Sequence, residues 1–475
     1  MRTWKHTRLG LAPTVLLLSL ASCTVGPDYR SAEQPSPATW TSSQAGRVRT
    51  SEVPTDWWRL FGDPQLTKHI KASARSNKDL AQAAARVREA RALRQVAAST
   101  MFPNIGARAN VLKETISENG RIPAGVIPEI PRRRNVYEGG FDAYWELDVF
   151  GGNRRRIEAA DARVAGVEET ERSIRLSVLA ETARNYLELR GSQRQLGIVE
   201  KNIGLQQRTL DLSKQKLSVG TGTEIEVARA EAQIRTTESR LPNLNAEIAA
   251  AAYRLSILTG QQPGALLGDL LKRKPLPAPP DIVPVGLPSG LLRRRPDVRR
   301  VERELAAATA DIGVATADLF PRFSLTGAAG TESLKFGDLF MSGSQVALLG
   351  PQIHWPIFQG GQIRANIKAT EARAEAAAAA FEQAVLTSLA ETESALERYG
   401  RELETRRRLE AAAAAHRSAV DLSQQRLEAG SGTLFEVIDA EARLLSVESD
   451  LVQSETTVML NLTALYKALG GGWEL

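Results

Sequence analysis

Long helical runs interrupted by pairs of glycines dominate the hydrophobic pattern of this 475-residue chain. Apolar side chains recur at helical spacing through about 65 residues up to Val219, and again through an alanine- and glutamate-rich stretch up to Ala429. Each run meets a Gly-x-Gly-Thr sequence, at 220–223 and at 430–433, and a further helical run follows. This repeated order predicts two helical hairpins that reverse direction at the glycine pairs.

Glycine suits such a reversal because it tolerates a positive φ where the first helix ends. The threonine after each pair supplies a side-chain oxygen that caps the start of the next helix. The expected turn residues are Gly220, Gly222, Thr223, Gly430, Gly432 and Thr433. The alternative interpretation is that these residues make helical turns and have no further role.

Alternation of apolar and polar residues predicts strands as well as helices. Residues 137–149 place apolar side chains on one face and acidic side chains on the other, and further β-like runs lie near 322–332 and 345–356. Such strands fit a membrane barrel whose outside meets lipid and whose inside meets water. In that arrangement Glu138, Asp142 and Glu146 face the lumen, where they favour cations.

Four strands are too few to close a barrel, and an open sheet edge has no hydrogen-bond partners in lipid. Three copies of the chain supply twelve strands, which is enough. The predicted fold is therefore mainly α with membrane β, in two tandem repeats that each combine a long α-helical hairpin with a β-hairpin. A homotrimer then forms a 12-stranded membrane β-barrel continuous with an α-helical barrel.

The N-terminal residues predict export and a lipid anchor. A basic opening precedes an apolar stretch over 9–20 that is too short to span a bilayer as a helix. The sequence LASC at 20–23 resembles the bacterial lipobox, in which cleavage precedes a cysteine that is then acylated. Cys23 is therefore the expected lipidation site, although a single cysteine also suits a small buried hydrophobe.

Composition shifts along the chain suggest where the domains begin and end. The predicted segments are a signal peptide at 1–22, a lipidated extended arm at 23–56, a first repeat at 57–260 with a β-hairpin at about 104–149, a proline-rich linker at 261–290, a second repeat at 291–470 with a β-hairpin at about 322–358, and a tail at 471–475.

Charge and motifs argue against several classes of function. The net charge of +6 is modest, and the basic runs at 132–134 and 293–300 lack the interleaved aromatic residues of a single-strand binder, so nucleic acid is not an expected partner. No phosphate-binding loop is present, and the glycine pair at 220–222 lacks the third glycine of a dinucleotide site. The four histidines are scattered. We expect no catalytic residue, no metal and no cofactor.

Four blocks of the sequence resemble the signature segments of TolC-like outer-membrane efflux lipoproteins. They are CTVGPDY at 23–29, WWRLFGDPQL at 57–66, LLRRRPDVRRVERELAAATADIGVATADLFPRFSLTG at 291–327 and GPQIHWPIFQGGQIRA at 350–365. The resemblance is closest to the lipidated branch that serves resistance-nodulation-division pumps. It extends from Cys23 to near the C-terminus.

This resemblance implies a homotrimeric exit duct in the outer membrane of a Gram-negative bacterium, with a long periplasmic portion. It implies as partners a periplasmic membrane-fusion adaptor, an inner-membrane resistance-nodulation-division pump reached through that adaptor, and outer-membrane lipid. The duct passes small molecules passively and is not an enzyme. The turns at the far tip of the helices are then the expected surface for adaptor docking.

The resemblance also implies an aperture behind the tips. Aligning the two hairpins puts Arg229 at the place of Asp439. The family narrows its tunnel behind the second tip, and the match assigns Phe435 and Asp439 to that constriction. We expect Phe435 and Asp439 to line the closed aperture and Arg229 to help hold it, whereas the alternative is a solvated helix face.

Two other functions remain open from the sequence. One is a TolC-like duct for type I protein secretion, and the other is a lipid-anchored periplasmic helical scaffold with no channel. The β-like runs favour a duct over a scaffold. The exported compound is not encoded in these residues, because an outer duct receives its cargo after the pump has selected it.

Overall fold

The computed structural model describes residues 24–31, 37–42, 48–117 and 131–473. They fall into two compact units that exchange segments along the chain. The first unit contains the described parts of 1–32, 88–166 and 302–380, and the second contains those of 33–87, 167–301 and 381–475. The signal peptide and Cys23 lie outside the described residues.

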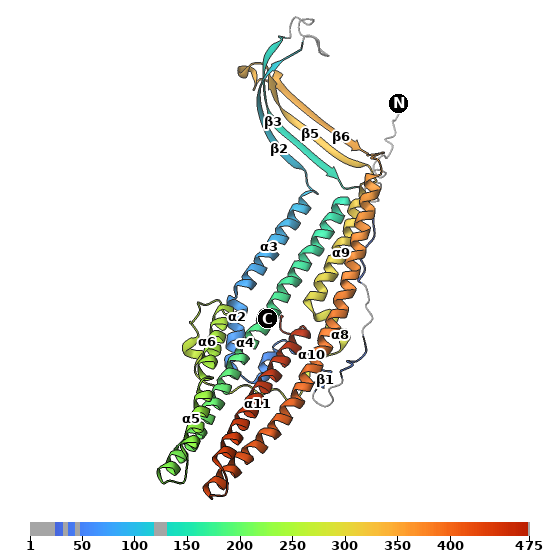
Figure 1. The fold of residues 1–475 in the computed structure, drawn as a ribbon. Coiled ribbons are helices and arrows are strands. Elements are labelled where there is room, and N and C mark those ends of the chain that lie inside the picture. Colours follow the sequence, from blue (N-terminus) through green and yellow to red (C-terminus); the bar gives the residue numbers. More distant parts are fainter. Residues whose placement is uncertain (1–23, 32–36, 43–47, 118–130, 474–475) are drawn as a thin grey trace, which may run out of the picture. The chain divides into compact units, whose positions relative to one another are not determined.

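The first unit holds a four-stranded antiparallel sheet in the order β2-β3-β5-β6 (Figure 1). Its strands are β2 (Asn104–Thr115), β3 (Arg133–Leu147), β5 (Arg322–Ser333) and β6 (Gln345–His354). The strands expected near 322–332 and 345–356 are present. Strands β3 and β5 join the two hairpins into one sheet, which the sequence pattern did not predict.

The cross-strand register gives this sheet one apolar and one polar face, because paired residues share a face and successive residues alternate. Phe141 of β3 pairs with Ala107 and Ala329, and Leu349 of β6 pairs with Gly327. Phe141 and Leu349 are both exposed in the single chain, as are Val111 and Ile353 on the same face. The outer sides of β2 and β6 pair with no strand among the described residues.

Helices make up most of the remaining chain. They are α2 (Pro64–Ser76), α3 (Lys78–Ser99), α4 (Gly152–Ser218), α5 (Glu224–Glu238), α6 (Leu241–Leu258), α7 (Leu267–Leu270), α8 (Pro288–Arg294), α9 (Pro296–Ala317), α10 (Gln362–Glu428) and α11 (Leu434–Ala468). Short 3₁₀ turns lie at η2 (Trp57–Phe61), η3 (Phe336–Asp338) and η4 (Ser342–Ser344), and a small parallel pair joins β1 (Val48–Arg49) to β4 (Val283–Pro284). Within the described ranges, no helix is both long enough and apolar enough to cross a membrane.

Two runs that the periodicity predicts as single helices are each divided. Helical spacing through about 67–101 predicts one helix there, but the structure divides this run into α2 and α3 at Asn77. The Asn77 backbone is extended, and its side-chain oxygen accepts hydrogen bonds from the first amides of α3. The run after Thr223 is divided into α5 and α6 around 239–240. Pro242 accounts for the second break, because proline lacks an amide hydrogen and its ring clashes with the carbonyl four residues earlier.

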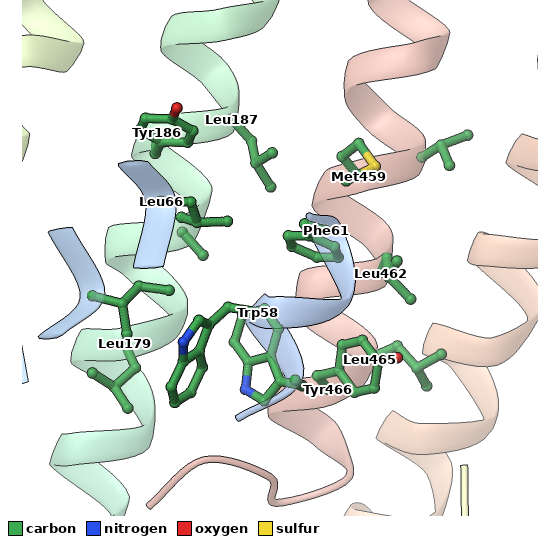
Figure 2. Packing of buried hydrophobic residues seen from close by; sticks show 14 of the residues in the cluster. Trp58, Phe61, Leu66, Leu179, Tyr186, Leu187, Met459, Leu462, Leu465 and Tyr466 are labelled. Atoms are coloured by element: carbon green, nitrogen blue, oxygen red, sulfur yellow. The ribbon is translucent and has the colours of Figure 1, made fainter. Parts of the chain in front are cut away.

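The main hydrophobic core lies in the second unit and gathers helices from both hairpins. Trp57 and Trp58 of η2 are fully buried, and Figure 2 shows Trp58 between α4 and α11. The Trp57 ring stacks on Tyr466 at a centroid distance of 5.3 Å, and its indole N–H donates to the carbonyl of Gly471. The same core also contains Phe61, Leu66, Leu179, Leu187, Met459, Leu462 and Leu465. Burial of these side chains holds α4 and α11 together without a disulfide.

Candidate functional site: the helical turns

The two Gly-x-Gly turns have the same backbone conformation. Gly220 has φ +78° and Gly430 has φ +72°, in the left-handed region that favours glycine. In the first turn the amides of residues 221 and 222 both donate to the Lys216 carbonyl, at 2.9 and 3.0 Å. In the second turn the amides of residues 431 and 432 both donate to the Arg426 carbonyl, at 3.0 and 2.9 Å. Both long helices therefore end in the same hydrogen-bonded cap.

The second glycine of each pair has a different role from the first. Gly222 and Gly432 do not have positive φ. A Cβ atom on Gly222 would lie 2.9 Å from the backbone nitrogen of Leu217, and one on Gly432 would lie 3.0 Å from that of Leu427. These residues are glycines because the chain passes too close to its own helix end for a side chain.

The threonines cap the returning helices, but their caps are unequal. Thr223 accepts a hydrogen bond from the amide of Glu226, whose carboxylate accepts one from the Thr223 amide at 2.8 Å. This reciprocal pair is a capping box. Thr433 accepts from the Glu436 amide at 3.3 Å, but the Glu436 carboxylate instead pairs with Arg426 at 3.4 Å.

The two turns also contact each other within the second unit. The ammonium group of Lys216 donates to the carbonyl of Leu427 at 3.2 Å, which links the end of α4 to the end of α10. Ile438 packs against a small buried cluster from each hairpin. The clusters contain Leu210, Ala230 and Ile234 on one side and Leu427, Leu434 and Val437 on the other.

The proposed aperture residues lie just beyond these clusters on α5 and α11. The guanidinium carbon of Arg229 lies 5.9 Å from the ring centroid of Phe435, within the range of a cation–π contact. The Asp439 carboxylate instead binds Arg443 on its own helix at 2.7 Å. The structure therefore brings Arg229 to Phe435 rather than to Asp439. Arg443 was not selected from the sequence, although its position four residues after Asp439 is a signal for such a pair.

Sequence reasoning also missed two buried carboxylates behind the turns. Glu441 and Glu448 of α11 have only 1% and 2% of their surface exposed. Glu448 binds Arg417 of α10 at 2.8 Å. Glu441 accepts hydrogen bonds from Thr209 of α4 at 2.7 Å and from Gln424 of α10 at 3.3 Å, and burial raises its pKa. Glu441, Glu448 and Glu455 follow one another at intervals of seven residues. In the sequence, this heptad spacing indicates that they share the side of α11 that packs against other helices.

The predicted lumen residues lie together on the polar face of the sheet in the first unit. Glu138, Asp142 and Glu146 alternate along β3, opposite to the apolar face. Arg108 pairs in register with Gly140, and Arg322 pairs with His354, so positive charges share this face. Within the described ranges, no group of three or more His, Cys, Asp or Glu side chains is placed to hold a metal ion.

The arm that follows Cys23 is held in the first unit by a buried arginine. Arg155 of α4 donates to the carbonyls of Val25 and Gly26 and binds the Asp28 carboxylate at 2.6 Å. The Val25 amide donates to the Phe150 carbonyl at 3.2 Å. The residues next to the predicted lipidation site therefore have a defined position beside the end of β3.

Comparison with known proteins places this architecture in a family. The model of the outer membrane efflux protein family matches residues 70–261 and 287–471. The chain belongs to this family. Outer membrane efflux proteins similar to it include the solvent efflux pump outer membrane protein SrpC of Pseudomonas putida, which is 31% identical over 473 residues and covers 98% of each chain. OprJ of Pseudomonas aeruginosa is 28% identical, and the alignment covers 98% of this chain and 96% of OprJ.

Solved structures of outer membrane efflux proteins have the same fold. The outer-membrane channel OprN matches with a TM-score of 0.89 at 37% identity, covering 95% of this chain and 100% of its own. The open state of the MtrE outer membrane channel of Neisseria gonorrhoeae matches with a TM-score of 0.81 at 27% identity, and the match covers 95% of this chain and 99% of the MtrE chain. The mainly helical fold with a membrane sheet that the sequence predicts is therefore confirmed.

Proposed function

We propose that this outer membrane efflux protein is the exit channel of a tripartite efflux system and conducts small molecules passively out of the periplasm. The observation that carries the proposal is the sheet, which has one exposed apolar face, one polar face and two edges that pair with no other strand of the described structure. A lone four-stranded sheet of this kind has unsatisfied edges in lipid. Three copies, paired β6 to β2, would close a twelve-stranded barrel with Glu138, Asp142 and Glu146 inside.

The assembly that we propose has two protein partners. Relatives that share nearly the full length of the chain are named as outer membrane components of efflux pumps, which supports a periplasmic adaptor and, through it, an inner-membrane resistance-nodulation-division pump. We assign adaptor docking to the two turns at 220–223 and 430–433. These turns are exposed, and Lys216 holds them together as one surface.

The lipid anchor and the domain organisation are part of the same proposal. Cleavage after residue 22 and acylation of Cys23 would attach the arm to the outer membrane, and the contacts of Arg155 support a fixed exit point for that arm. Two separate matches to one family model support a first repeat at 57–260 and a second at 291–470.

The closed aperture is assigned to Phe435, Asp439 and Arg229 behind the turns. The contact of Arg229 with Phe435 would stiffen the aromatic side chain, which is otherwise exposed. Asp439 pairs with Arg443, and both charged side chains lie on the exposed side of α11. Three symmetric copies of the pair would narrow the tip, and weak pairs can bias a two-state gate when they act together.

Single-channel conductance in planar bilayers tests this proposal. Purified lipidated protein, its Asp439→Ala variant and the matched control Asp450→Ala, an exposed carboxylate on the same helix, are compared at one salt concentration. We expect a small conductance in the wild type, a several-fold rise in Asp439→Ala, and no change in Asp450→Ala.

The other outcomes each reject a named part of the proposal. Equal conductance in all three proteins would reject the aperture while keeping the channel. No conductance from a folded oligomer would reject the channel in favour of a helical scaffold. Loss of secretion of a protein substrate on gene deletion, without increased sensitivity to small toxic compounds, would favour the protein-secretion duct.

A further inference from the structure

The strongest unassigned feature of the molecule is a buried polar seam where α4 meets α10 and α11 behind the turns. The main core of this unit is apolar, but this interface is lined by polar side chains. They are Asn202, Gln206 and Thr209 of α4, Gln424 of α10, and Glu441 and Glu448 of α11. Buried polar groups in a helix interface are costly unless each finds a partner.

The two carboxylates of the seam have different surroundings. Glu448 faces the guanidinium of Arg417 at 2.8 Å and the amide of Asn202, so its negative charge is compensated. The hydrogen-bond partners of Glu441 in the described structure are neutral, namely Thr209 on α4 and Gln424 on α10. Its Oε2 atom is buried and has no hydrogen-bond partner among the described residues.

Three cations on the elements around the seam bind other carboxylates. On α10, Arg417 binds Glu448. On α4, Lys214 binds Glu231 of α5 at 3.3 Å. On α11 itself, Arg443 binds Asp439 on the exposed side. Among the described residues, no cation forms an ion pair with Glu441.

A carboxyl group in such a place fits the structure better when it carries a proton. The neutral form avoids the cost of burying an unpaired charge, and its O–H can donate to a nearby acceptor. The seam has acceptors to spare, because Oδ1 of Asn202 and Oε1 of Gln206 are buried without partners among the described residues. Gln206 lies three positions before Thr209 and therefore shares its side of α4.

We propose that Glu441 is a proton-binding site that controls how tightly α11 packs against α4 and α10 behind the turns. When Glu441 is protonated, the seam is closed and dry. When Glu441 is ionised, the seam admits water around the charge and α11 loosens. The site is distinct from the exposed aperture residues, although it lies only two positions after Asp439 on the same helix.

The direction of the pH effect follows from the burial of the group. Burial raises the pKa of Glu441 in the folded protein above its value in an unfolded chain. Its contribution to stability is therefore complete below the unfolded value and is lost as pH rises through the folded value. Mild acid tightens the seam and mild alkali loosens it.

A consequence for transport rests on the proposed function, but the change in packing does not. The turn of α11 that carries Glu441 follows directly on the turn that carries Phe435 and Asp439. A loosened seam frees that segment to move away from α4. If this segment bounds the aperture, protonation of Glu441 favours the closed channel.

Hydrogen–deuterium exchange of the full-length purified oligomer tests the proposal without added labels. The Glu441→Gln variant keeps the shape of the side chain and stays neutral at every pH. The measured quantity is the ratio of exchange rates, wild type over variant, for backbone amides at 437–445 between pH 5 and pH 8. Because both proteins are measured at the same pH, the ratio cancels the intrinsic dependence of amide exchange on pH. The control is Asp450→Asn, the corresponding change at an exposed carboxylate of the same helix.

We expect the ratio for Glu441→Gln to be near one at pH 5 and to rise several-fold by pH 8, while the ratio for Asp450→Asn stays near one. A ratio independent of pH, or an equal rise in the control, would overturn the proposal. The size of the oligomer is measured on the same samples, and a variant that does not form the wild-type oligomer is treated as misfolded and left out. If it is misfolded, Glu441→Asp replaces it, and its carboxylate on a shorter side chain is expected to shift the pH at which exchange changes.

Conductance measured over the same pH range distinguishes the proton site at Glu441 from its link to the aperture. A pH-dependent exchange ratio with no pH-dependent conductance would keep the proton site and reject its link to the aperture. A protein that forms no channel at all would reject the proposed function, while the exchange result would still decide the role of Glu441.

Discussion

The two helical hairpins begin their return in the same way and then differ. Both turns use a glycine at positive φ, a second glycine against the helix end, and a threonine cap. After the first turn the chain runs through α5, breaks near 239–240 and resumes as α6, whereas after the second turn α11 is continuous for 35 residues. A four-residue motif therefore determines the reversal, and residues outside it determine how rigid the returning helix is.

The difference in rigidity coincides with a difference in what the helices carry. Continuous α11 holds the buried carboxylates and Phe435, and it packs in both the turn clusters and the main core. In the first hairpin, the capping box of Thr223 and Glu226 secures the start of α5 locally. The second turn uses its corresponding glutamate to bind Arg426 across the turn.

The largest expected effect comes from the second glycine of each pair. Gly432→Ala places a methyl group 3.0 Å from the backbone nitrogen of Leu427, so the turn must shift. Overpacking of this kind costs about 1–3 kcal/mol. The opening free energy of the turn, measured by native-state hydrogen exchange, is expected to fall by that amount. Gly430→Asn is the matched control, because asparagine tolerates a left-handed backbone and this position has open space around it. Equal losses in both variants would contradict the separate roles of the two glycines.

Pro242 tests whether the break in the first hairpin is local in origin. Pro242→Ala restores an amide hydrogen and removes the ring that disfavours a continuous helix. We expect the amides at 239–241 to exchange more slowly, by a factor corresponding to about 1 kcal/mol. The same substitution at Pro288, the first residue of α8, controls for the general effect of removing a proline. Unchanged exchange at 239–241 would mean that packing, rather than proline, holds the break.

Removing the threonine caps should have a smaller effect on stability, and the effect should differ between the two turns. Thr223→Ala removes the side-chain acceptor of a reciprocal capping box, and loss of an N-cap costs about 1 kcal/mol. Thr433→Ala removes one hydrogen bond, and we expect roughly half that cost. Exchange of the first-turn amides of α5 and α11 measures both. A larger loss at Thr433 would show that the capping box adds nothing.

The smallest expected effect is at Arg229. Arg229→Ala removes the cation from the face of Phe435, and an exposed contact of this kind contributes about 0.5–1 kcal/mol. We expect slightly faster exchange at the start of α11, together with partial rescue by Arg229→Lys. Arg235→Ala, an exposed arginine on the same helix that pairs only within α5 in the described structure, is the control. An identical effect in the control would remove Arg229 from the proposed aperture.

Local patterns were sufficient to place most of the elements. The helical period indicates α4 and α10, alternation indicates β5 and β6, and the glycine pairs indicate both turns. The breaks at Asn77 and Pro242 were also readable, because an asparagine cap and a proline act within four residues. They were missed because apolar periodicity continues across them.

The sequence by itself thus determined the period of each element, the points of reversal and the alternation of the strands, since each depends on residues a few positions apart. Only the tertiary structure decided that β3 pairs with β5, that Arg229 meets Phe435, and that Glu441 is buried without a cation partner among the described residues. These contacts join segments up to about two hundred residues apart. Their register is selected by the packing of whole helices and strands, which no local pattern contains.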